Sequence, residues 1–523
     1  MDVTELDRPR PPAPEAAPSY ALDALTRRFP GVVAVDRAKL SVGRGELHGI
    51  IGRNGAGKSV LVSMIAGVIR PTSGRLLVGG QEVDTARYSP GRARELGIAL
   101  IPQEPHFATS LSVTDNLFMG RSITNRLGFS QTAAMQRKTE EVLATLGIEA
   151  RPSDPLSELP LESQQLLAFG RAVFVDRARV VLLDEITASL SQARKLELLR
   201  LLHKLLAETA DLSFTLISHH IAEIMEFCDH VTVMRDGRSV ATIEVAATNE
   251  QELADWIVGD ADQTEGKHAK TSARQVGAPI LSLAGLSAGR SFQGLDLEIH
   301  EREVIGFAGL EGSGKNAAVE SLFGLVVPTA GEIKLAGKPV EFRSPRDALD
   351  AGIAYLPRHR EAHGVVQNLS VEVNTLLSAY DGYRRPLGFL KRHEGRHIAR
   401  QRGAHLAVKT PSIDALIDNL SGGNKQKVLI NRLALVKPRL FLLNEPTRGV
   451  DIASKPALLA VVRDELAADS AVVMLSESED ELIAVCDRIL VFFKGEVREV
   501  LERGSPAFTV GRLYELIQGV QRS

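Results

Sequence analysis

Eight residues near the start of the chain have the types and spacing of a loop that binds phosphate groups. They fit the pattern G-x-x-x-x-G-K-[ST], with an apolar strand-like run before them (47–51) and a helical pattern after them (60–69). Glycines in such a loop let backbone N–H groups point at phosphate oxygens, the lysine adds positive charge, and the serine hydroxyl can ligate Mg²⁺. This setting argues against the alternative, a glycine-rich turn before an ordinary helix. In order, the residues are Gly52, Arg53, Asn54, Gly55, Ala56, Gly57, Lys58 and Ser59.

Polar residues at the ends of apolar runs complete this set. Asp184 and Glu185 end the run 180–183; Asp184 suits Mg²⁺ held through water, and Glu185 suits the orientation or deprotonation of an attacking water. Gln103 follows a second run and would sense the metal or the γ-phosphate, and His219 follows a third and would contact the γ-phosphate as a neutral imidazole. Taken singly, a capping acid or a structural histidine is the ordinary alternative. With the phosphate loop upstream, they predict a site for a nucleotide and Mg²⁺.

The composition limits the classes of protein to which the chain can belong. Its 523 residues are too many for one core, and 44% hydrophobic with 24% charged residues is typical of a soluble protein. A formal charge of −3 gives no basic face for nucleic acid, and no apolar run approaches the ~20 residues of a membrane helix. Two cysteines make no disulfide framework, and the proline-rich start lacks the pattern of a signal segment. We therefore expect a cytosolic protein that does not bind nucleic acid.

The chain repeats itself. Lys315 lies 257 positions after Lys58 (315 − 58), and Cys486 lies 258 positions after Cys228 (486 − 228). An offset that drifts so little indicates two copies of one domain with small loop changes, and it explains the cysteines as one buried helix position present twice. The second phosphate loop keeps the residues expected to bind nucleotide, Gly309, Gly312, Gly314 and Lys315.

The domain organisation follows from this repeat. We expect a disordered tail over 1–19, a first nucleotide-binding domain over 20–260, a polar linker over 261–278 and a second, degenerate domain over 279–519. Strand-like and helical runs alternate in each copy, which predicts an α/β fold with a mostly parallel sheet and helices on its faces. Helical spacing without strands predicts a helical insert over about 111–159.

The sequence Leu-Ser-Gly-Gly-Asn-Lys-Gln at 420–426 resembles the signature motif of the ATP-binding-cassette (ABC) ATPases, and the residues described above resemble the other motifs of that family. Two cassettes, with Phe-Pro-Gly-Val at 29–32 and Asn-Glu-Pro-Thr-Arg-Gly-Val-Asp at 444–451, look like the monosaccharide-importer class (ribose, galactose or xylose type). The resemblance covers roughly 20–519 and implies two tandem P-loop ABC ATPase domains that bind ATP and Mg²⁺. Phe29 would stack on adenine or pack in the core, and both readings stay open.

The resemblance also implies partners and residue roles. In that family each ATP lies between the phosphate loop of one cassette and the signature of the other, and the ATPase drives a separate membrane permease fed by an extracytoplasmic solute-binding protein. The chain would thus sit peripherally on the cytoplasmic face of the membrane. The implied catalytic residues are Glu185, His219 and Gln103. The implied metal-binding residues are Ser59, Gln103 and Asp184. The implied signature contacts to ATP come from Ser421, Gly422 and Gly423.

The two implied sites are not equal. The first site would have a consensus residue at every position, whereas the signature that would complete the second has Pro160 in place of serine and Glu162 in place of glycine. A carboxylate about 4 Å from the γ-phosphate would repel it by roughly 4 kcal/mol at an effective dielectric near 20. Other departures replace the metal-binding Ser/Thr and Asp, the glutamine and the histidine; they are Asn316, Asn444, Arg358 and Glu477. We therefore expect ATP hydrolysis at the first site and a structural or regulatory role, with weakened nucleotide binding, for the second.

Three alternatives to a monosaccharide importer remain at this stage. A soluble twin-cassette ATPase acting on ribosomes is disfavoured by the short linker and the altered second site. A non-hydrolysing, ATP-gated scaffold is disfavoured by the intact Asp184, Glu185 and His219. The third alternative is an importer of nucleosides, polyols or autoinducer-type sugars, which no residue of this chain can distinguish.

Overall fold

Strand β3 (Leu47–Ile51), which precedes the first phosphate loop, lies inside a six-stranded sheet. The computed structural model describes residues 17–29, 32–103, 105, 107–190, 192–259, 276–358, 363–383, 391–450 and 454–520. In it this sheet has the order β10-β9-β3-β8-β7-β6, parallel except for the antiparallel edge strand β10. The other strands are β6 (Ile98–Ile101), β7 (Val180–Asp184), β8 (Ser213–Ile217), β9 (His230–Arg235) and β10 (Arg238–Glu244). The predicted α/β fold with a mostly parallel sheet is confirmed.

A second, antiparallel sheet in the first half was not predicted. Its order is β2-β1-β4-β5, made of β1 (Tyr20–Phe29), β2 (Val32–Val42), β4 (Ser73–Val78) and β5 (Gln81–Glu82). In β2 the later residues alternate between buried and exposed, as expected when one face packs on a core and the other meets water. Parallel strands such as β3 and β8 are instead buried along their whole length, which explains why their sequences are continuous apolar runs.

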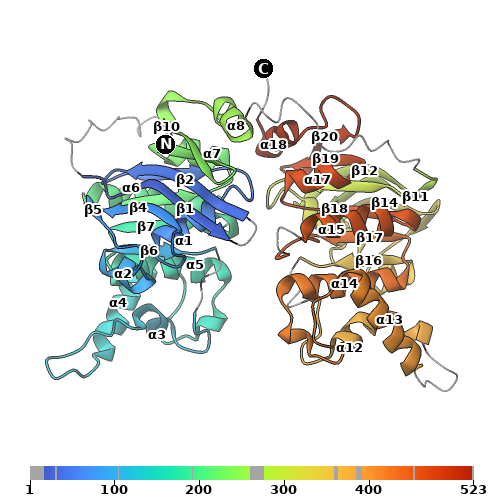
Figure 1. Cartoon of the computed structure of the whole chain (residues 1–523), viewed down its shortest axis with the longest axis horizontal. Helices are drawn as coiled ribbons and strands as arrows, with labels where there is room; N and C mark the ends of the chain where they lie inside the picture. The colour runs from blue at the N-terminus through green and yellow to red at the C-terminus, as the bar shows by residue number, and fades with distance from the viewer. Residues whose placement is uncertain are drawn as a thin grey trace. The chain divides into compact units, whose positions relative to one another are not determined.

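In the first half, helices pack around the core sheet (Figure 1). Helices α3 and α4 of the predicted insert lie beyond its edge strand β6. Helix α1 (Lys58–Ile65) begins at the lysine of the phosphate loop and ends before the predicted limit of 69, because Gly67 adopts a positive φ of 72°. The other helices are α2 (Pro90–Glu95), α3 (Val113–Phe118), α4 (Thr132–Thr145), α5 (Leu161–Gly170), α6 (Gln192–Glu208), α7 (Ile221–Phe227) and α8 (Glu250–Val258).

The second half repeats this architecture. Its core sheet has the order β16-β17-β18-β13-β19-β20, and its antiparallel sheet the order β12-β11-β14-β15. The strands are β11 (Pro279–Ala288), β12 (Phe292–His300), β13 (Val304–Ala308), β14 (Ala330–Leu335), β15 (Lys338–Val340), β16 (Ile353–Leu356), β17 (Leu440–Asn444), β18 (Ala471–Leu475), β19 (Arg488–Phe493) and β20 (Glu496–Glu502). The helices are α9 (Lys315–Leu322), α10 (Pro345–Asp350), α12 (Val371–Leu376), α13 (Arg392–His405), α14 (Gly422–Val436), α15 (Lys455–Ala460), α16 (Ala467–Asp469), α17 (Glu479–Val485) and α18 (Val510–Gln518).

Strand β17 shows how the core sheet of the second half is held between two layers. Leu440 and Leu442 belong to the apolar cluster that includes the antiparallel sheet and α9. Phe441 and Leu443 belong to the cluster on the opposite face, which includes α14, α17 and α18. Because side chains alternate along a strand, the sheet buries both faces, and only its strand ends remain available for polar, functional residues.

Contacts divide the chain into two compact units between Ile257 and Val258, whereas the predicted limits of tail, domains and linker stay predictions. Cys228 and Cys486 are buried free thiols, and each lies directly after a helix (α7 and α17) rather than within it. Within the described ranges, no helix combines the length and the apolar character needed to cross a membrane.

Candidate nucleotide sites

The first phosphate loop is shaped by Gly57 and closed by Lys58. Gly57 has φ of 94°, and a Cβ atom there would come within 2.5 Å of the carbonyl oxygen of Ala34, so no other residue fits. The buried Lys58 ammonium group donates to the carbonyl oxygens of Gly52 at 2.6 Å and Arg53 at 3.1 Å. These bonds hold the positive charge against the loop at the start of α1, as binding of phosphate requires.

Ser59 and Asp184 present the oxygen atoms that a magnesium ion needs. The Ser59 hydroxyl donates to Oδ1 of Asp184 at 3.3 Å. Burial raises the pKa of Asp184 to about 6, with a further rise from the charge of Glu185, because the site itself supplies too little positive charge to compensate. A hydroxyl and a carboxylate are hard oxygen ligands, so these residues fit Mg²⁺.

Gln103 lies at the same end of the sheet, two residues after the last residue of β6, with an exposed side chain. Its backbone carbonyl oxygen accepts a hydrogen bond from Nε2 of Gln165 on α5 at 2.7 Å. Among the described residues no hydrogen bond joins its side chain to Ser59 or Asp184. The predicted metal-sensing role of Gln103 therefore remains a prediction.

Glu185 and His219 are brought together from the ends of two neighbouring strands. Nδ1 of His219, after β8, lies 3.2 Å from Oε1 of Glu185, after β7. Glu185 has φ of 51°, a left-handed conformation that is uncommon outside glycine and occurs at functional sites. Burial would raise the pKa of Glu185, but the hydrogen bond from His219 and the nearby positive charges, including Lys58, lower it overall. An ionised carboxylate held by a histidine is suited to orient or deprotonate water.

Phe29 lies at the end of β1 and is half-buried. The guanidinium carbon of Arg27 lies 4.5 Å from the centre of the Phe29 ring. The neighbouring residues 30 and 31 of the predicted motif fall outside the described part of the chain. The ring is partly open and is covered by a cation, which is compatible with both predicted roles.

The second phosphate loop keeps the backbone but not the metal-binding groups. Gly314 has φ of 103°, and Nζ of Lys315 donates to the carbonyl oxygen of Gly309 at 2.6 Å, as in the first loop. In place of the hydroxyl and carboxylate, Nδ2 of Asn444 donates to Oδ1 of Asn316 at 3.4 Å. Neither amide can carry the negative charge that favours a divalent ion, so these residues do not fit Mg²⁺.

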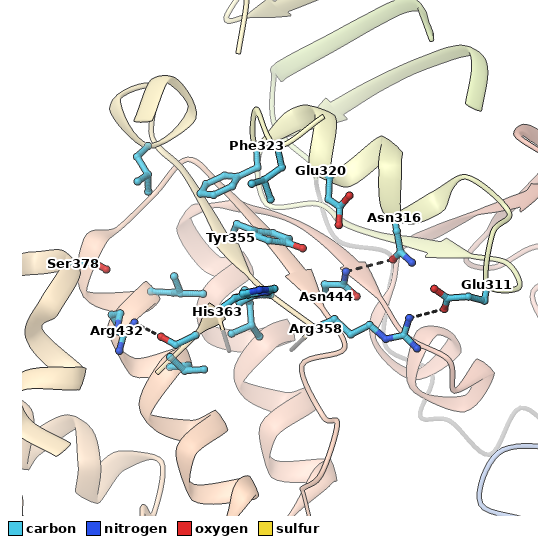
Figure 2. Close-up of a pocket in the computed structure, with 17 residues that line it drawn as sticks. Glu311, Asn316, Glu320, Phe323, Tyr355, Arg358, His363, Ser378, Arg432 and Asn444 are labelled. Carbon is cyan, nitrogen blue, oxygen red and sulfur yellow. Dashed lines mark hydrogen bonds and ion pairs between the residues drawn. The ribbon is translucent and has the colours of Figure 1, made fainter. Parts of the chain in front are cut away.

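An arginine links three loops of the second half, as Figure 2 shows in part. Arg358 donates from Nη1 to Oε2 of Glu311 in the phosphate loop at 2.5 Å, and from Nη2 to Oε1 of Glu477 after β18 at 2.6 Å. Burial would lower the pKa of Arg358, but the two carboxylates raise it overall. Arg358, Glu311, Asn316 and Asn444 line one part of a cavity of about 820 Å³. Ion pairs of Arg358 thus connect the phosphate loop with the loops that follow β16 and β18.

Glu445 occupies the position of Glu185 but has the opposite electrostatic environment. Its φ of 55° matches that of Glu185, so the local backbone is the same in both halves. Burial, together with the negative charge of Glu477, raises the pKa of Glu445 to about 8. At neutral pH Glu445 is therefore largely protonated, and a protonated carboxyl cannot accept a proton from water.

The two signature turns also differ. Ser421 precedes α14, and its hydroxyl oxygen accepts a hydrogen bond from Nδ2 of Asn424 at 2.8 Å. Gly422 begins α14, and a Cβ atom on Gly423 would lie 3.3 Å from the Cα atom of Val450, so glycine fits a close approach of backbone. The second half therefore keeps the serine and the two small glycines of the signature motif at the start of α14.

In the first half, Pro160 precedes α5, and Glu162 lies 3.8 Å from Nε of Arg194. The repulsion of roughly 4 kcal/mol predicted for Glu162 assumed an unpaired carboxylate. The nearby guanidinium of Arg194 reduces it, so that prediction overstated the effect. Pro160 still lacks both the hydroxyl and the backbone N–H of a serine.

Sequence reasoning missed Arg194 beside Glu162 and the ion pairs that join Arg358 to Glu311 and Glu477. The repeat itself holds a signal for the contacts of Arg358, but none for Arg194. Aligning the halves matches Glu311 with Asn54, Arg358 with Gln103 and Glu477 with His219, so three neutral or weakly basic positions become charged together. The appearance of one arginine and two glutamates at these matched positions would have predicted the ion pairs of Arg358.

Comparison with known proteins gives matches over both halves. The family described as ABC transporter matches residues 35–188 and again 292–448. Ribose import ATP-binding protein RbsA 3 of Rubrobacter xylanophilus is 37% identical over 486 residues, which cover 93% of this chain and 96% of the relative. Ribose import ATP-binding protein RbsA 1 of Burkholderia thailandensis is 35% identical, covering 92% and 94%. The protein RbsA of a Jannaschia species, with the same description, is 36% identical, covering 94% of each chain.

Proposed function

The chain belongs to the ABC transporter family, and from this premise we propose that it is the subunit whose ATP hydrolysis energises import of a monosaccharide or a related small solute. The chain is an ATPase with two tandem cassettes. The observation that carries the hydrolytic part of the proposal is the contact between Glu185 and His219 at 3.2 Å in a half with a complete phosphate loop, since it supplies a carboxylate suited to orient or deprotonate water.

Hydrolysis is assigned to the first site. Lys58 and the backbone N–H groups of its loop bind and orient the phosphates. Ser59 and Asp184 would hold Mg²⁺, which when bound neutralises charge on the phosphate oxygens. Glu185 orients or deprotonates the attacking water, and His219 holds the Glu185 carboxylate and contacts the γ-phosphate. The family resemblance implies that the signature residues Ser421 and Gly423 would add hydrogen bonds and the positive end of the α14 dipole to the bound ATP.

The second site is assigned a structural or regulatory role. Lys315 and the glycines of its loop can still bind phosphate. However, the Asn316–Asn444 pair supplies no metal ligand of the required charge, and the raised pKa of Glu445 removes its ability to act as a base. The protein would then hydrolyse one ATP for each closure of the two halves.

The proposed partners are transmembrane permease subunits and an extracytoplasmic solute-binding protein, which place the chain on the cytoplasmic face of the membrane. The names of the three relatives, each matched over at least 92% of this chain, support ribose as the first cargo to test. No observation favours the ribosome-associated alternative. Nucleoside, polyol and autoinducer-type cargoes differ only in proteins outside this chain.

The proposal is tested by reconstitution. The purified chain, combined in vesicles with permease subunits that co-purify with it from membranes and with a ribose-binding protein, is expected to release phosphate and take up labelled ribose. Addition of the binding protein with ribose should stimulate phosphate release above that with either alone. Phosphate release that no sugar-loaded binding protein stimulates would contradict the import role, and absence of phosphate release would contradict the enzymatic one.

A further inference from the structure

A single buried carboxylate, Glu223 on α7, joins the loops that carry the two catalytic side chains. Its Oε2 accepts from the hydroxyl of Thr187 at 2.8 Å and from the hydroxyl of Ser218 at 2.8 Å, and its Oε1 accepts from Nζ of Lys195 at 2.8 Å. Glu223 is only 8% exposed. A carboxylate removed from water is stable only when its oxygens are satisfied in this way.

The three donors come from elements next to the site. Thr187 lies in the short turn 186–189 that begins directly after Glu185. Ser218 directly precedes His219, and its hydroxyl oxygen also accepts from the backbone N–H of His220 at 3.0 Å. Lys195 lies on α6, the helix that follows the same turn. Fixing Thr187 against Ser218 therefore fixes the backbone of Glu185 relative to that of His219.

The second half contains the same arrangement around Glu481. Its oxygens accept from the hydroxyls of Thr447 at 2.6 Å and Ser476 at 2.8 Å and from Nζ of Lys455 at 2.8 Å. In that half the residue after the serine is Glu477, which contacts Arg358 rather than a catalytic carboxylate. The network thus sets the position of whichever residue follows the serine, and it is independent of the chemistry of that residue.

We propose that Glu223 is a positioning residue for ATP hydrolysis, acting through its hydrogen bonds to Thr187 and Ser218 to hold His219 in contact with Glu185. The inference rests on the proposed function of the first site. The hydrogen bonds described for Glu223 go to Thr187, Ser218 and Lys195, and none of these residues belongs to the phosphate loop. Its loss therefore affects the chemical step through the Glu185–His219 contact and leaves the binding of phosphates by Lys58 intact.

The substitution Glu223→Gln keeps the size of the side chain but replaces one acceptor oxygen with an amide that donates. We expect kcat for ATP hydrolysis to fall about tenfold or more, while KM for ATP changes by less than about threefold, because an interaction that acts on the chemical step changes kcat. The matched control is Glu481→Gln, which removes the same network from the half without a catalytic pair. It should leave kcat within about twofold of the wild type.

A double substitution separates positioning from general loss of structure. If Glu223 acts through His219, the variant His219→Ala/Glu223→Gln should be no slower than His219→Ala alone, because residues that act as a unit are not additive. Losses that multiply, or equal losses in Glu223→Gln and Glu481→Gln, would overturn the inference, as would a Glu223→Gln variant as fast as the wild type. Thermal unfolding and binding of a fluorescent ATP analogue identify a variant that fails to fold. Wild-type protein without phosphate release would instead contradict the proposed function.

Discussion

Arg358 donates a hydrogen bond to Glu477 at 2.6 Å, and the matching positions of the first half hold Gln103 and His219. In the first half these positions are a neutral amide and an imidazole that contacts Glu185. In the second half they form an ion pair that Glu311 extends to the phosphate loop. The two halves share a backbone but connect the loops of their sites by different means, and this difference yields separate predictions for each.

The first prediction concerns the two matched glutamates. Glu185→Gln should lower the rate of phosphate release at least about a hundredfold, because it removes the group that orients or deprotonates water. Glu445→Gln should leave the rate within about twofold, because the raised pKa already keeps that carboxyl largely neutral at pH 7. Steady-state ATPase assays of both variants test this, and equal losses would show that the sites are equivalent.

The second prediction concerns the two signature turns. If ATP at the first site is completed by the second signature, as we propose, Ser421→Ala should lower the rate of ATP hydrolysis about tenfold, since one hydrogen-bond donor to the transition state would be lost. Pro160→Ala is the matched change in the other turn and should have little effect, because Pro160 has no hydroxyl to lose. If Pro160→Ala were the more damaging of the two, the cross-pairing of phosphate loop and signature would be wrong.

The third prediction concerns the number of metal ions. With a non-hydrolysable ATP analogue and Mn²⁺ in place of Mg²⁺, followed by desalting, electron paramagnetic resonance should detect one bound Mn²⁺ per chain. The variant Asp184→Asn copies the second-half residue into the first half and should bind none. Two bound ions per wild-type chain would mean that Asn316 and Asn444 accept a metal after all.

The parts of the structure that could be predicted from the sequence are those with a local signal. Strands such as β7 and β8 are buried on both faces and so appear as short apolar runs, and polar residues directly after them had to meet at one edge of the sheet. Contacts between distant loops leave no such trace. Glu311 occupies a loop position of the phosphate motif where any residue is allowed, and nothing local connects it with Arg358. Glu223 looks like any surface glutamate on a helix until its three donors are known.

The fourth prediction concerns the stability that Arg358 provides. Its side chain is about one-fifth exposed, and Arg358→Gln would leave Glu311 and Glu477 without their shared partner. Because Glu311 is 43% and Glu477 50% exposed, we expect the free energy of unfolding of the second half to fall by only about 0.5–2 kcal/mol, the sum of two partly exposed ion pairs. Arg346→Gln, which removes an exposed pair with Asp350, serves as the control and should have no measurable effect. Equal stabilities of the Arg358 variant and the wild type would mean that the ion pairs of Arg358 with Glu311 and Glu477 do not stabilise the fold.

The last prediction is a pH dependence of opposite sign in the two halves. The folded-state pKa of Glu445 is raised from 4.5 to about 8, so its contribution to stability is fully present below about pH 4.5 and is lost as the pH rises toward 8. The folded-state pKa of Glu185 is lowered, because the hydrogen bond and charge of His219 outweigh burial, so its contribution is present above pH 4.5 and lost as the pH falls below it. Urea unfolding without nucleotide should therefore show that Glu445→Gln gains stability relative to the wild type as the pH rises from about 5 to about 8. Glu185→Gln should show no such gain. A Glu445→Gln curve parallel to that of the wild type would mean that Glu445 is ionised in the folded protein, and the electrostatic reason for assigning no hydrolysis to the second site would be lost.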